Sequence, residues 1–236
     1  MNLGNPFAKG NTADIYQFEN KIIKLLKDDF PNGEALFEAK KQEFAYSCGL
    51  DVPKILEVTE FEGRQAIVME YINGQTLGEL ILNTMELVEY YFDVYVNIQM
   101  NVHKIVVKQG FLEPMSEKLE RQIISGKILN AYQKNELLRR LDSLKFDLKL
   151  CHGDFHPYNL ILRDDRVTII DWVDSCSGDI RADVYRSYLL ISQSSLKLAE
   201  MYLRIPCQKS IENLVYRDSI IFSERKKQVK LHQTRK

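Results

Sequence analysis

Polar side chains gather in the segment 151–173, CHGDFHPYNLILRDDRVTIIDWV, in a pattern that could do chemistry. Asp154 and Asn159 precede a short apolar run, and Asp171 follows a second one. Carboxylate and amide oxygens are ligands for Mg²⁺, which usually keeps further positions for water and phosphate. A second carboxylate outside the metal shell can accept the proton of an attacking hydroxyl group. The segment therefore predicts a magnesium site at Asn159 and Asp171, with Asp154 as the proton acceptor.

Two short strands must bring these groups together. Residues 160–170 contain two apolar, β-rich runs separated by the charged turn Arg163-Asp164-Asp165-Arg166, which predicts a hairpin. Strands of a hairpin run antiparallel, so the start of one lies beside the end of the other. We therefore expect Asp154, Asn159 and Asp171 to converge on one pocket.

The spacing from Asp154 to Asn159 is also the Asp-x-x-x-x-Asn spacing of the protein-kinase catalytic loop. Gly153 stands where protein kinases have Arg before this Asp, and Trp172 stands where Phe-Gly follows their metal-binding Asp. HGDFHPYN followed by IIDW thus resembles the aminoglycoside and choline phosphotransferase branch of the kinase-like fold. Acidic residues at strand ends are often only turn formers, but five polar residues in this order argue against that explanation.

The resemblance covers about residues 4–192. It implies an α+β, two-lobe protein-kinase-like fold with a small antiparallel-sheet N-lobe and a mainly helical C-lobe. We expect residues 1–72 to form the nucleotide-binding N-lobe, 73–223 the helical C-lobe with the catalytic loop and acceptor site, and 224–236 a basic tail. The implied reaction transfers the γ-phosphoryl group of ATP, with Mg²⁺, to a hydroxyl group of a small molecule.

The N-lobe should hold the nucleotide through a lysine on a strand. Alternation predicts strands over 14–18 and 21–26, joined by the turn Glu19-Asn20. Lys24 lies among apolar neighbours, where a lysine is costly to bury unless it is paired. The resemblance implies that Lys24 holds the α- and β-phosphates of ATP. Lys21 is the alternative if the other side of the strand faces the nucleotide.

A helix expected over residues 32–49 must supply a carboxylate for this lysine. Its predicted apolar stripe consists of Leu36, Phe37, Phe44, Ala45 and Cys48. The resemblance selects Glu38, because it lies eleven residues before the Gly-x-x-Val-Pro ending that begins at Gly49. Glu34 and Glu43 are the alternatives.

Two further segments are expected to contact ATP. Small residues around Thr12 could let backbone N–H groups approach a phosphate, although a plain hairpin turn explains this segment at least as well. The stretch IVMEYINGQTL resembles the link between lobes in this family. Backbone groups near Glu70 to Ile72 would then hydrogen-bond the adenine edge.

The C-lobe is expected to be mainly helical. Apolar side chains at helical spacing predict a long helix over 84–109, shorter helices over about 116–125 and 133–144, and another that opens within 177–183 and runs to about residue 192. His103 on the long helix is interpreted as a packed structural side chain. The resemblance implies that Asp183 accepts hydrogen bonds from the backbone of the HGD loop and that His152 supports this loop.

The composition is that of an ordinary globular protein, with 236 residues, 45% hydrophobic and 28% charged. The net charge of −1 provides no field that would attract nucleic acid or a membrane. The four cysteines are widely spaced, which argues against a zinc site or a disulfide framework. There is no basic-then-apolar leader and no apolar run near ~18 residues. We therefore expect a cytoplasmic protein with no membrane span and no nucleic-acid partner.

Three other functions compete with the small-molecule kinase. The first is a protein Ser/Thr kinase, which the absence of Arg before Asp154 and of Asp-Phe-Gly argues against. The second is a nucleotide-binding pseudoenzyme, which is disfavoured because each expected catalytic position holds a competent residue. The third is a different fold with a coincidental motif. The sequence leaves the acceptor open among antibiotics, choline, sugars and other alcohols, and it leaves the oligomeric state open.

Overall fold

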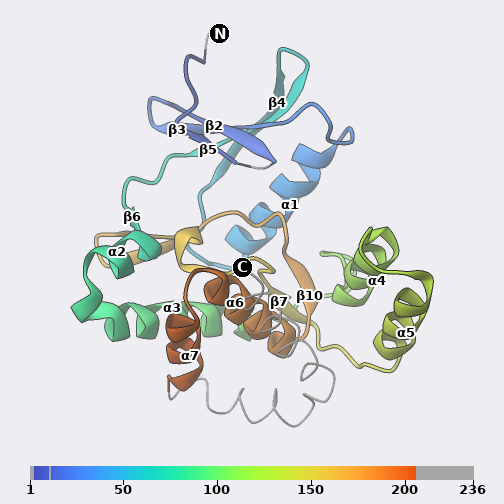
Figure 1. Cartoon of the computed structure of the whole chain (residues 1–236). Helices are drawn as coiled ribbons and strands as arrows, with labels where there is room; N and C mark the ends of the chain where they lie inside the picture. Colours follow the sequence, from blue (N-terminus) through green and yellow to red (C-terminus); the bar gives the residue numbers. More distant parts are fainter. Residues whose placement is uncertain (1–2, 11, 206–236) are drawn as a thin grey trace.

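The computed structural model of the chain describes residues 3–10 and 12–205. Its N-terminal part is an antiparallel sheet with one helix, and the rest of the described chain is mainly helical (Figure 1). The α+β, two-part architecture expected from the sequence is therefore confirmed. The basic tail expected at 224–236 lies outside the described residues. Every described helix is too short or too polar to cross a bilayer.

The N-terminal sheet has five antiparallel strands in the order β1-β2-β3-β5-β4. These strands are β1 (Ala8–Lys9), β2 (Ala13–Phe18), β3 (Lys21–Leu26), β5 (Arg64–Glu70) and β4 (Ile55–Phe61). Tight turns at Glu19 and at Glu62-Gly63, each with positive φ, join the two hairpins. The strands predicted over 14–18 and 21–26, and the turn between them, are confirmed. Helix α1 (Glu34–Ser47) packs against β4 and β5.

The predicted apolar stripe of α1 is wrong in part. Leu36 is 48% exposed and Phe37 is 46% exposed. The buried face consists instead of Ala35, Glu38, Ala39, Lys41, Gln42 and Ala45. Small alanines let the helix approach the sheet closely, and its long polar side chains find partners in the interior, as described below. Hydrophobicity alone therefore pointed to the wrong face.

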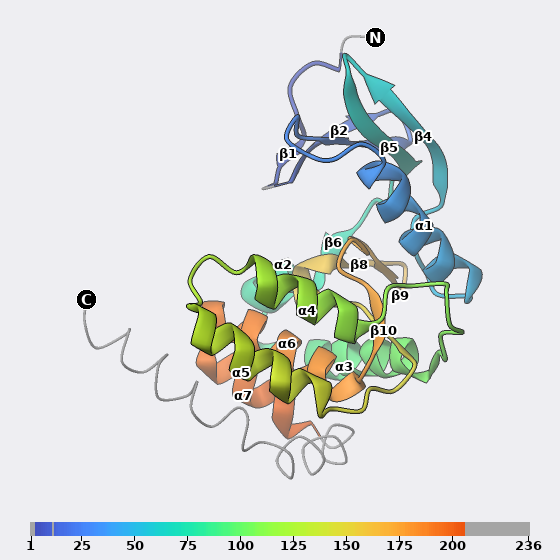
Figure 2. The same cartoon turned by 90° about the vertical axis from the view of Figure 1, so that its right-hand side faces the viewer.

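The C-terminal part begins after a linker of residues 71–74. Its elements are β6 (Gln75–Thr76), α2 (Leu77–Asn83), the short 3₁₀ helix η1 (Met85–Leu87), α3 (Val88–Lys104), α4 (Met115–Ser125), α5 (Ala131–Asp142), α6 (Ile180–Ser194) and α7 (Leu196–Arg204). The predictions for α4, α5 and α6 are confirmed to within a few residues. Helices α4 and α5 lie side by side at one flank (Figure 2). The main core is formed by buried side chains such as Phe92, Tyr95, Phe155, Trp172 and Tyr202.

The long helix predicted over 84–109 is too long at its C-terminal end. Helix α3 ends at Lys104, Ile105 is extended, and Val106 forms an isolated antiparallel bridge with Lys149. Leu150 N donates to the carbonyl of Ile105 at 3.0 Å, and Val107 N donates to the carbonyl of Leu148 at 2.8 Å. Pairing with a distant strand thus overrides the helical periodicity of Ile105 and Val106. Helix α2, which begins at a capping box between Thr76 and Glu79, was not predicted.

Two small sheets hold the segment that carries the expected chemistry. Strands β8 (Leu160–Arg163) and β9 (Arg166–Ile169) form the predicted hairpin, with Asp164 and Asp165 at φ 48° and 63°. Two consecutive positive φ angles are typical of the tight hairpin turns that Asp and Asn tolerate. The second sheet pairs β7 (Lys149–Cys151) with β10 (Cys176–Gly178). The polar loop therefore starts and ends on paired strands, with the 3₁₀ helix η2 (Pro157–Asn159) between them.

Candidate functional site

Lys24 forms the centre of a buried charge cluster between the two parts of the chain. Its Nζ lies 2.5 Å from Glu38 Oε1 and 2.9 Å from Asp171 Oδ1. Burial lowers the pKa of Lys24, but the two carboxylates outweigh it and hold this pKa above its ordinary value. Lys24 is therefore a permanent cation. The structure gives it Glu38 as partner, whereas Glu34 and Glu43 form no ion pair with it.

Asp171 follows β9 and occupies the left-handed region at φ 63°, which is uncommon for a residue other than glycine. Its side chain is 37% exposed, so one face of the carboxylate remains open to solvent. Ile170 N donates to the carbonyl of Asn159 at 3.0 Å. The end of β9 therefore lies beside the start of β8, and the backbones at Asp171 and Asn159 converge as antiparallel pairing requires.

Asn159 and Asp154 are joined by hydrogen bonds within the loop. Asn159 Nδ2 donates to the carbonyl of Asp154 at 2.9 Å and lies 3.4 Å from its Oδ2. These contacts occupy the amide nitrogen and leave Asn159 Oδ1 as a free acceptor among the described residues. An amide oxygen and the carboxylate of Asp171 form a donor set that suits Mg²⁺.

The protein offers only part of a metal shell. Among the described residues, no group of three His, Cys, Asp or Glu side chains is placed to hold a metal ion. Mg²⁺ at phosphate-transfer sites is typically bound by one or two carboxylates together with substrate phosphates. The donor set of Asn159 and Asp171 therefore fits Mg²⁺ when a nucleotide completes the shell.

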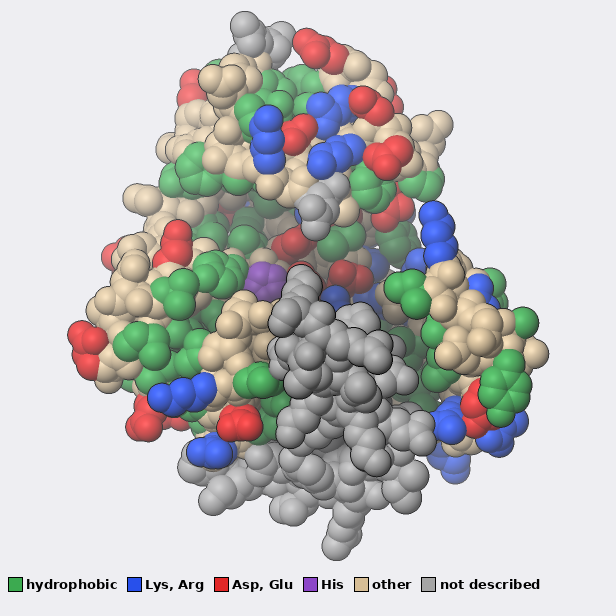
Figure 3. All heavy atoms as spheres, in the orientation of Figure 1, with side chains coloured by type: hydrophobic (Ala, Val, Ile, Leu, Met, Phe, Trp, Pro, Cys, Tyr) green, Lys and Arg blue, Asp and Glu red, His purple; other side chains and the backbone are tan. Residues whose placement is uncertain are grey.

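The carboxylate of Asp154 is half-buried beside two basic side chains. His156 Nε2 lies 3.4 Å from its Oδ2, and Arg186 Nη2 lies 3.8 Å from its Oδ1. Burial raises the pKa of Asp154, but the contacts with His156 and the charge of Arg186 outweigh it and hold the pKa below its ordinary value. Asp154 is therefore ionised at neutral pH and can accept a hydrogen bond from a hydroxyl group. In the space-filling view, acidic side chains and a histidine lie in a hollow between the two lobes (Figure 3).

His152 lies beneath the loop rather than in the hollow. It is fully buried, and its ring packs against Phe155 and Trp172. Nε2 donates to the carbonyl of Ile170 at 3.1 Å, and Nδ1 accepts from the backbone N–H of Asp154 at 3.3 Å. Burial lowers the pKa of His152, which favours this neutral form. The ring therefore positions the loop and the end of β9.

Gly153 is required by the path of the loop. Its φ is 80°, and a Cβ at this position would lie 2.3 Å from the carbonyl oxygen of Asp174. Any other residue would therefore push apart the loop and the segment that follows Asp171. The Arg that precedes the catalytic Asp in protein kinases does not fit this backbone.

Asp183 is buried beneath the loop and accepts three hydrogen bonds. Gly153 N donates at 2.8 Å, His152 N at 3.2 Å and His103 Nε2 at 2.9 Å. Burial raises the pKa of Asp183, but the hydrogen bonds from His103 and Gly153 outweigh it and hold this pKa below its ordinary value. The carboxylate has the contacts that its expected role requires. No local pattern predicts the pairing with His103, which lies 80 residues earlier.

Two lysines that the sequence analysis did not select hold the segment after Asp171. Lys41 Nζ on α1 donates to the carbonyl of Val173 at 2.7 Å. Lys118 Nζ on α4 contacts Asp174 Oδ1 at 2.7 Å and also the carbonyl of the same residue. Both lysines are buried. Helical lysines usually extend into solvent, so their spacing alone could not have identified them.

Three further residues are expected to contact ATP: Thr12, Glu70 and Ile72. Thr12 is exposed in its turn, and its carbonyl accepts from Lys27 N at 3.0 Å. Glu70 N donates to the carbonyl of Lys54 at 3.0 Å, which fixes the start of the linker. No backbone carbonyl among the described residues accepts the N–H of Ile72. The structure describes no contact between these three residues and Lys24.

Comparisons with known proteins agree with this architecture. The sequence model of the family described as "Phosphotransferase enzyme family" matches residues 4–214 of this chain. Among curated proteins, a probable serine/threonine-protein kinase PknB of Lactococcus lactis subsp. lactis (strain IL1403) is 32% identical over 84 residues. This match covers 31% of the chain and only 13% of that protein.

Solved structures share the fold at low sequence identity. ADP-bound aminoglycoside phosphotransferase APH(2'')-Ib is 20% identical, with 93% of this chain and 86% of that chain covered and a TM-score of 0.56. Aminoglycoside phosphotransferase APH(4)-Ia is 15% identical, with 84% and 75% covered and a TM-score of 0.61. Amicoumacin kinase hAmiN, in complex with AMP-PNP, Ca²⁺ and Ami, is 14% identical, with 84% and 69% covered and a TM-score of 0.60. The predicted kinase-like fold is thus confirmed.

Proposed function

Because the chain belongs to the phosphotransferase enzyme family, we propose that it transfers the γ-phosphoryl group of ATP to a hydroxyl group of a small molecule. The observation that carries this proposal is the ion-pair chain from Glu38 through Lys24 to Asp171. It joins the N-terminal sheet to the end of β9, beside the loop that bears Asp154 and Asn159. A buried lysine between two carboxylates at this position suits a polyphosphate ligand.

The N-lobe, proposed as residues 1–72, binds the nucleotide. Lys24 donates to the α- and β-phosphates, and Glu38 fixes the ammonium group in that position. The free N–H of Ile72 and backbone groups at Glu70 contact the adenine edge, and the turn at Thr12 covers the phosphates. Each of these contacts uses a group whose position is set by the sheet or its linker.

The metal site is proposed at Asn159 Oδ1 and the carboxylate of Asp171. When bound there, Mg²⁺ neutralises charge on the phosphate oxygens. In the present structure Lys24 already contacts one oxygen of Asp171. The lysine and the two oxygen ligands therefore act on the same phosphates from neighbouring positions.

The C-lobe, proposed as residues 73–223, presents the acceptor hydroxyl to the nucleotide. Asp154 accepts a hydrogen bond from this hydroxyl, orients it and takes its proton as the new phosphate ester forms. His152 and Asp183 position the loop without contact with the reactants. Phosphoryl transfer depends mainly on positioning and charge stabilisation, so a rigid loop is the main requirement. The use of ATP favours a cytoplasmic location.

A protein hydroxyl is the second candidate acceptor, because the chain shares 32% identity over 84 residues with a probable serine/threonine-protein kinase. Gly153 and Trp172 argue against it, since both replace residues that protein kinases use around this loop. The acceptor that we propose is a small-molecule alcohol. Aminoglycosides, choline and sugars are the classes to compare first.

The proposal is tested by measuring ADP release from Mg·ATP by the purified full chain with aminoglycosides, choline, sugars and a generic protein. We expect turnover with one small-molecule class. Asp154→Asn and Asp171→Asn should each lower this turnover by about 10²–10⁴-fold, because one removes the proton acceptor and the other a metal ligand. Asp165→Asn is the matched control, since this exposed turn residue has the positive φ that Asn also tolerates. Nucleotide binding without turnover in the whole panel, or full activity of either variant, would contradict the proposal.

A further inference from the structure

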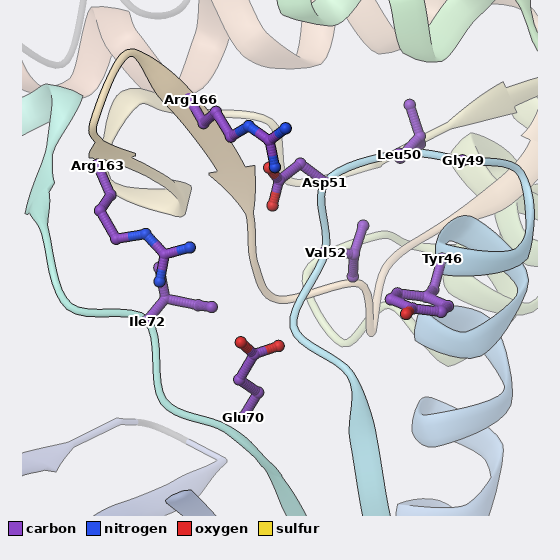
Figure 4. Close-up of a pocket in the computed structure, with 9 residues that line it drawn as sticks. All are labelled: Tyr46, Gly49, Leu50, Asp51, Val52, Glu70, Ile72, Arg163 and Arg166. Carbon is purple, nitrogen blue, oxygen red and sulfur yellow. The ribbon is translucent and has the colours of Figure 1, made fainter. Parts of the chain in front are cut away.

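A separate cavity lies between the linker, the turn after α1 and the β8–β9 hairpin. Its volume is about 440 Å³, and it is lined by Tyr46, Gly49, Leu50, Asp51, Val52, Glu70, Ile72, Arg163 and Arg166 (Figure 4). None of these residues belongs to β2, β3 or the 152–159 loop, which carry the residues proposed for phosphoryl transfer. Glu70 and Ile72 also belong to the proposed adenine contact, which uses their backbone groups, whereas their side chains line this cavity (Figure 4). The cavity is therefore separate from the loop that bears Asp154.

Two arginines at the hairpin line this cavity, and neither has an ion-pair partner among residues 3–10 and 12–205. Arg163 and Arg166 are direct cross-strand neighbours at the tight turn of β8 and β9. Like charges in directly opposed positions destabilise a strand pair. Within the part of the chain that the structure describes, no carboxylate forms an ion pair with either guanidinium. An anionic group bound between them would relieve the repulsion and accept hydrogen bonds from both.

The same cavity also offers negative charge. Glu70 forms no ion pair or side-chain hydrogen bond with another described residue. Asp51 accepts a hydrogen bond from Thr168 Oγ1 at 2.7 Å through Oδ1, which leaves Oδ2 available. Figure 4 shows the Glu70 carboxylate and the two guanidinium groups on different walls of the same hollow. A simple anion would face these carboxylates as well as the arginines, so the charge pattern favours a ligand that carries both signs.

Apolar side chains line a smaller part of the cavity. Val52 and Ile72 are buried hydrophobic residues, and Leu50 and Tyr46 contribute further apolar surface. We propose that this cavity binds a free α-amino acid with an apolar side chain. Its carboxylate lies between Arg163 and Arg166, its ammonium group faces Glu70, and its side chain packs against Val52 and Tyr46 (Figure 4).

This site has a mechanical consequence. Its walls come from the linker, from the turn that follows α1 and from the hairpin that ends at the proposed metal ligand. An occupant would join these three segments, and so limit the motion of the two lobes about the linker. That consequence rests on the proposed function, whereas binding of the amino acid does not.

Binding is tested by titration calorimetry on the full chain without nucleotide. The probes are leucine and phenylalanine, with acetate and inorganic phosphate as anions alone and putrescine as a cation alone. We expect an apolar amino acid to bind, and its N-acetyl and amide derivatives to bind weaker by about tenfold or more, because each lacks one charge. Equal binding of the derivatives, of an anion or of putrescine would overturn the proposal, as would the absence of amino-acid binding.

Two variants locate the site. Arg163→Ala with Arg166→Ala should abolish binding, and Arg163→Lys with Arg166→Lys should weaken it, because lysine lacks the planar fork. Arg139→Ala is the control, since Arg139 is an exposed arginine of α5 that is not part of the cavity. Asp154→Asn should bind the amino acid normally. Binding that survives in the alanine variant, or that is lost in Asp154→Asn, would overturn the assignment, and neither result depends on kinase activity.

Discussion

The candidate site depends on the buried ion pair of Lys24 and Glu38. Neither side chain is accessible enough to be solvated, so each charge needs the other. Removal of one partner from a buried pair costs about 3–5 kcal/mol, because the remaining charge is left uncompensated. Replacement of both costs less than the sum of the two single changes.

A double-mutant cycle tests this coupling. We expect Lys24→Met and Glu38→Gln each to lower the free energy of unfolding in urea by about 3–5 kcal/mol, and the double variant to lower it by clearly less than their sum. Lys21→Met, on the same strand but exposed, should change it by no more than about 0.5 kcal/mol. Strict additivity of the two single changes would show that the pair is not coupled.

Asp183 gives the loop a pH-dependent stability. Its pKa in the folded protein lies below its ordinary value. Its contribution is therefore fully present above the unfolded-state pKa of about 3.9 and is lost as the pH falls through the lower folded value. Asp183→Asn removes this contribution while it keeps the size of the side chain.

The free energies of unfolding of wild type and Asp183→Asn should therefore differ most at neutral pH. We expect a difference of about 3–5 kcal/mol at pH 7 that shrinks below about pH 4. Urea titrations across this pH range measure it, with Asp165→Asn as the exposed control. A difference that stays constant down to acid pH would contradict the ionised, hydrogen-bonded state of Asp183.

At the element scale, the pairing of β7 with β10 fixes both ends of the polar loop. Cys151 and Cys176 are direct cross-strand neighbours and are both buried. Opposed residues of an antiparallel pair have Cα atoms about 4.5–5.5 Å apart, which is within the range that a disulfide spans. The hydrogen bond with Cys176, together with burial, raises the pKa of the Cys151 thiol well above its ordinary value, whereas the same hydrogen bond lowers the pKa of the Cys176 thiol. Cys176 is therefore the thiol that reacts first with an oxidant.

A chemical cross-link tests this register. In a background with Cys48→Ser and Cys207→Ser, treatment with diamide in mild urea should form one Cys151–Cys176 disulfide. Diamide takes two protons and two electrons from the two thiols and is reduced to its hydrazine. Mass spectrometry of the unreduced peptides detects it. A further Cys176→Ser change should prevent the cross-link. Failure of the two thiols to join, under conditions that oxidise other dithiols, would show that the strands pair in another register.

At the scale of the whole molecule, the two lobes meet at the proposed nucleotide site. Lys24 and Lys41 lie on N-terminal elements, and both reach the segment around Asp171 in the C-terminal part. A ligand held by both lobes stabilises the folded chain by mass action. At about 100 times its Kd, such a ligand adds about 2.7 kcal/mol to the free energy of unfolding.

Thermal unfolding measures this linkage. We expect Mg·ATP to raise the Tm of the wild type, and ATP with EDTA to raise it less. Asp171→Asn should lose most of the Mg²⁺-dependent part, because it removes the only carboxylate of the proposed metal shell. Asp165→Asn should respond as the wild type does. An unchanged Tm of the wild type in Mg·ATP would contradict nucleotide binding.

Local patterns in the sequence predicted the parts of this fold that neighbouring residues determine. Alternating apolar residues and charged turns identified β2, β3, β8 and β9, because side-chain direction and turn geometry depend on a few adjacent positions. The spacing from Asp154 through Asn159 to Asp171 predicted the candidate site, because these residues are also close to one another in the sequence. Each of these features lies within about twenty residues of the chain.

Pairs of residues that are distant in the chain became visible only in the fold. It turned the polar face of α1 inward, ended α3 at Lys104 and brought His103 to Asp183. It also placed Lys41 and Lys118 on the segment after Asp171. In each case a partner far along the chain supplied the hydrogen bond or charge that made the arrangement stable, which hydrophobic periodicity does not encode. Local sequence patterns therefore identify the groups that can do the chemistry, and long-range packing selects which of them meet.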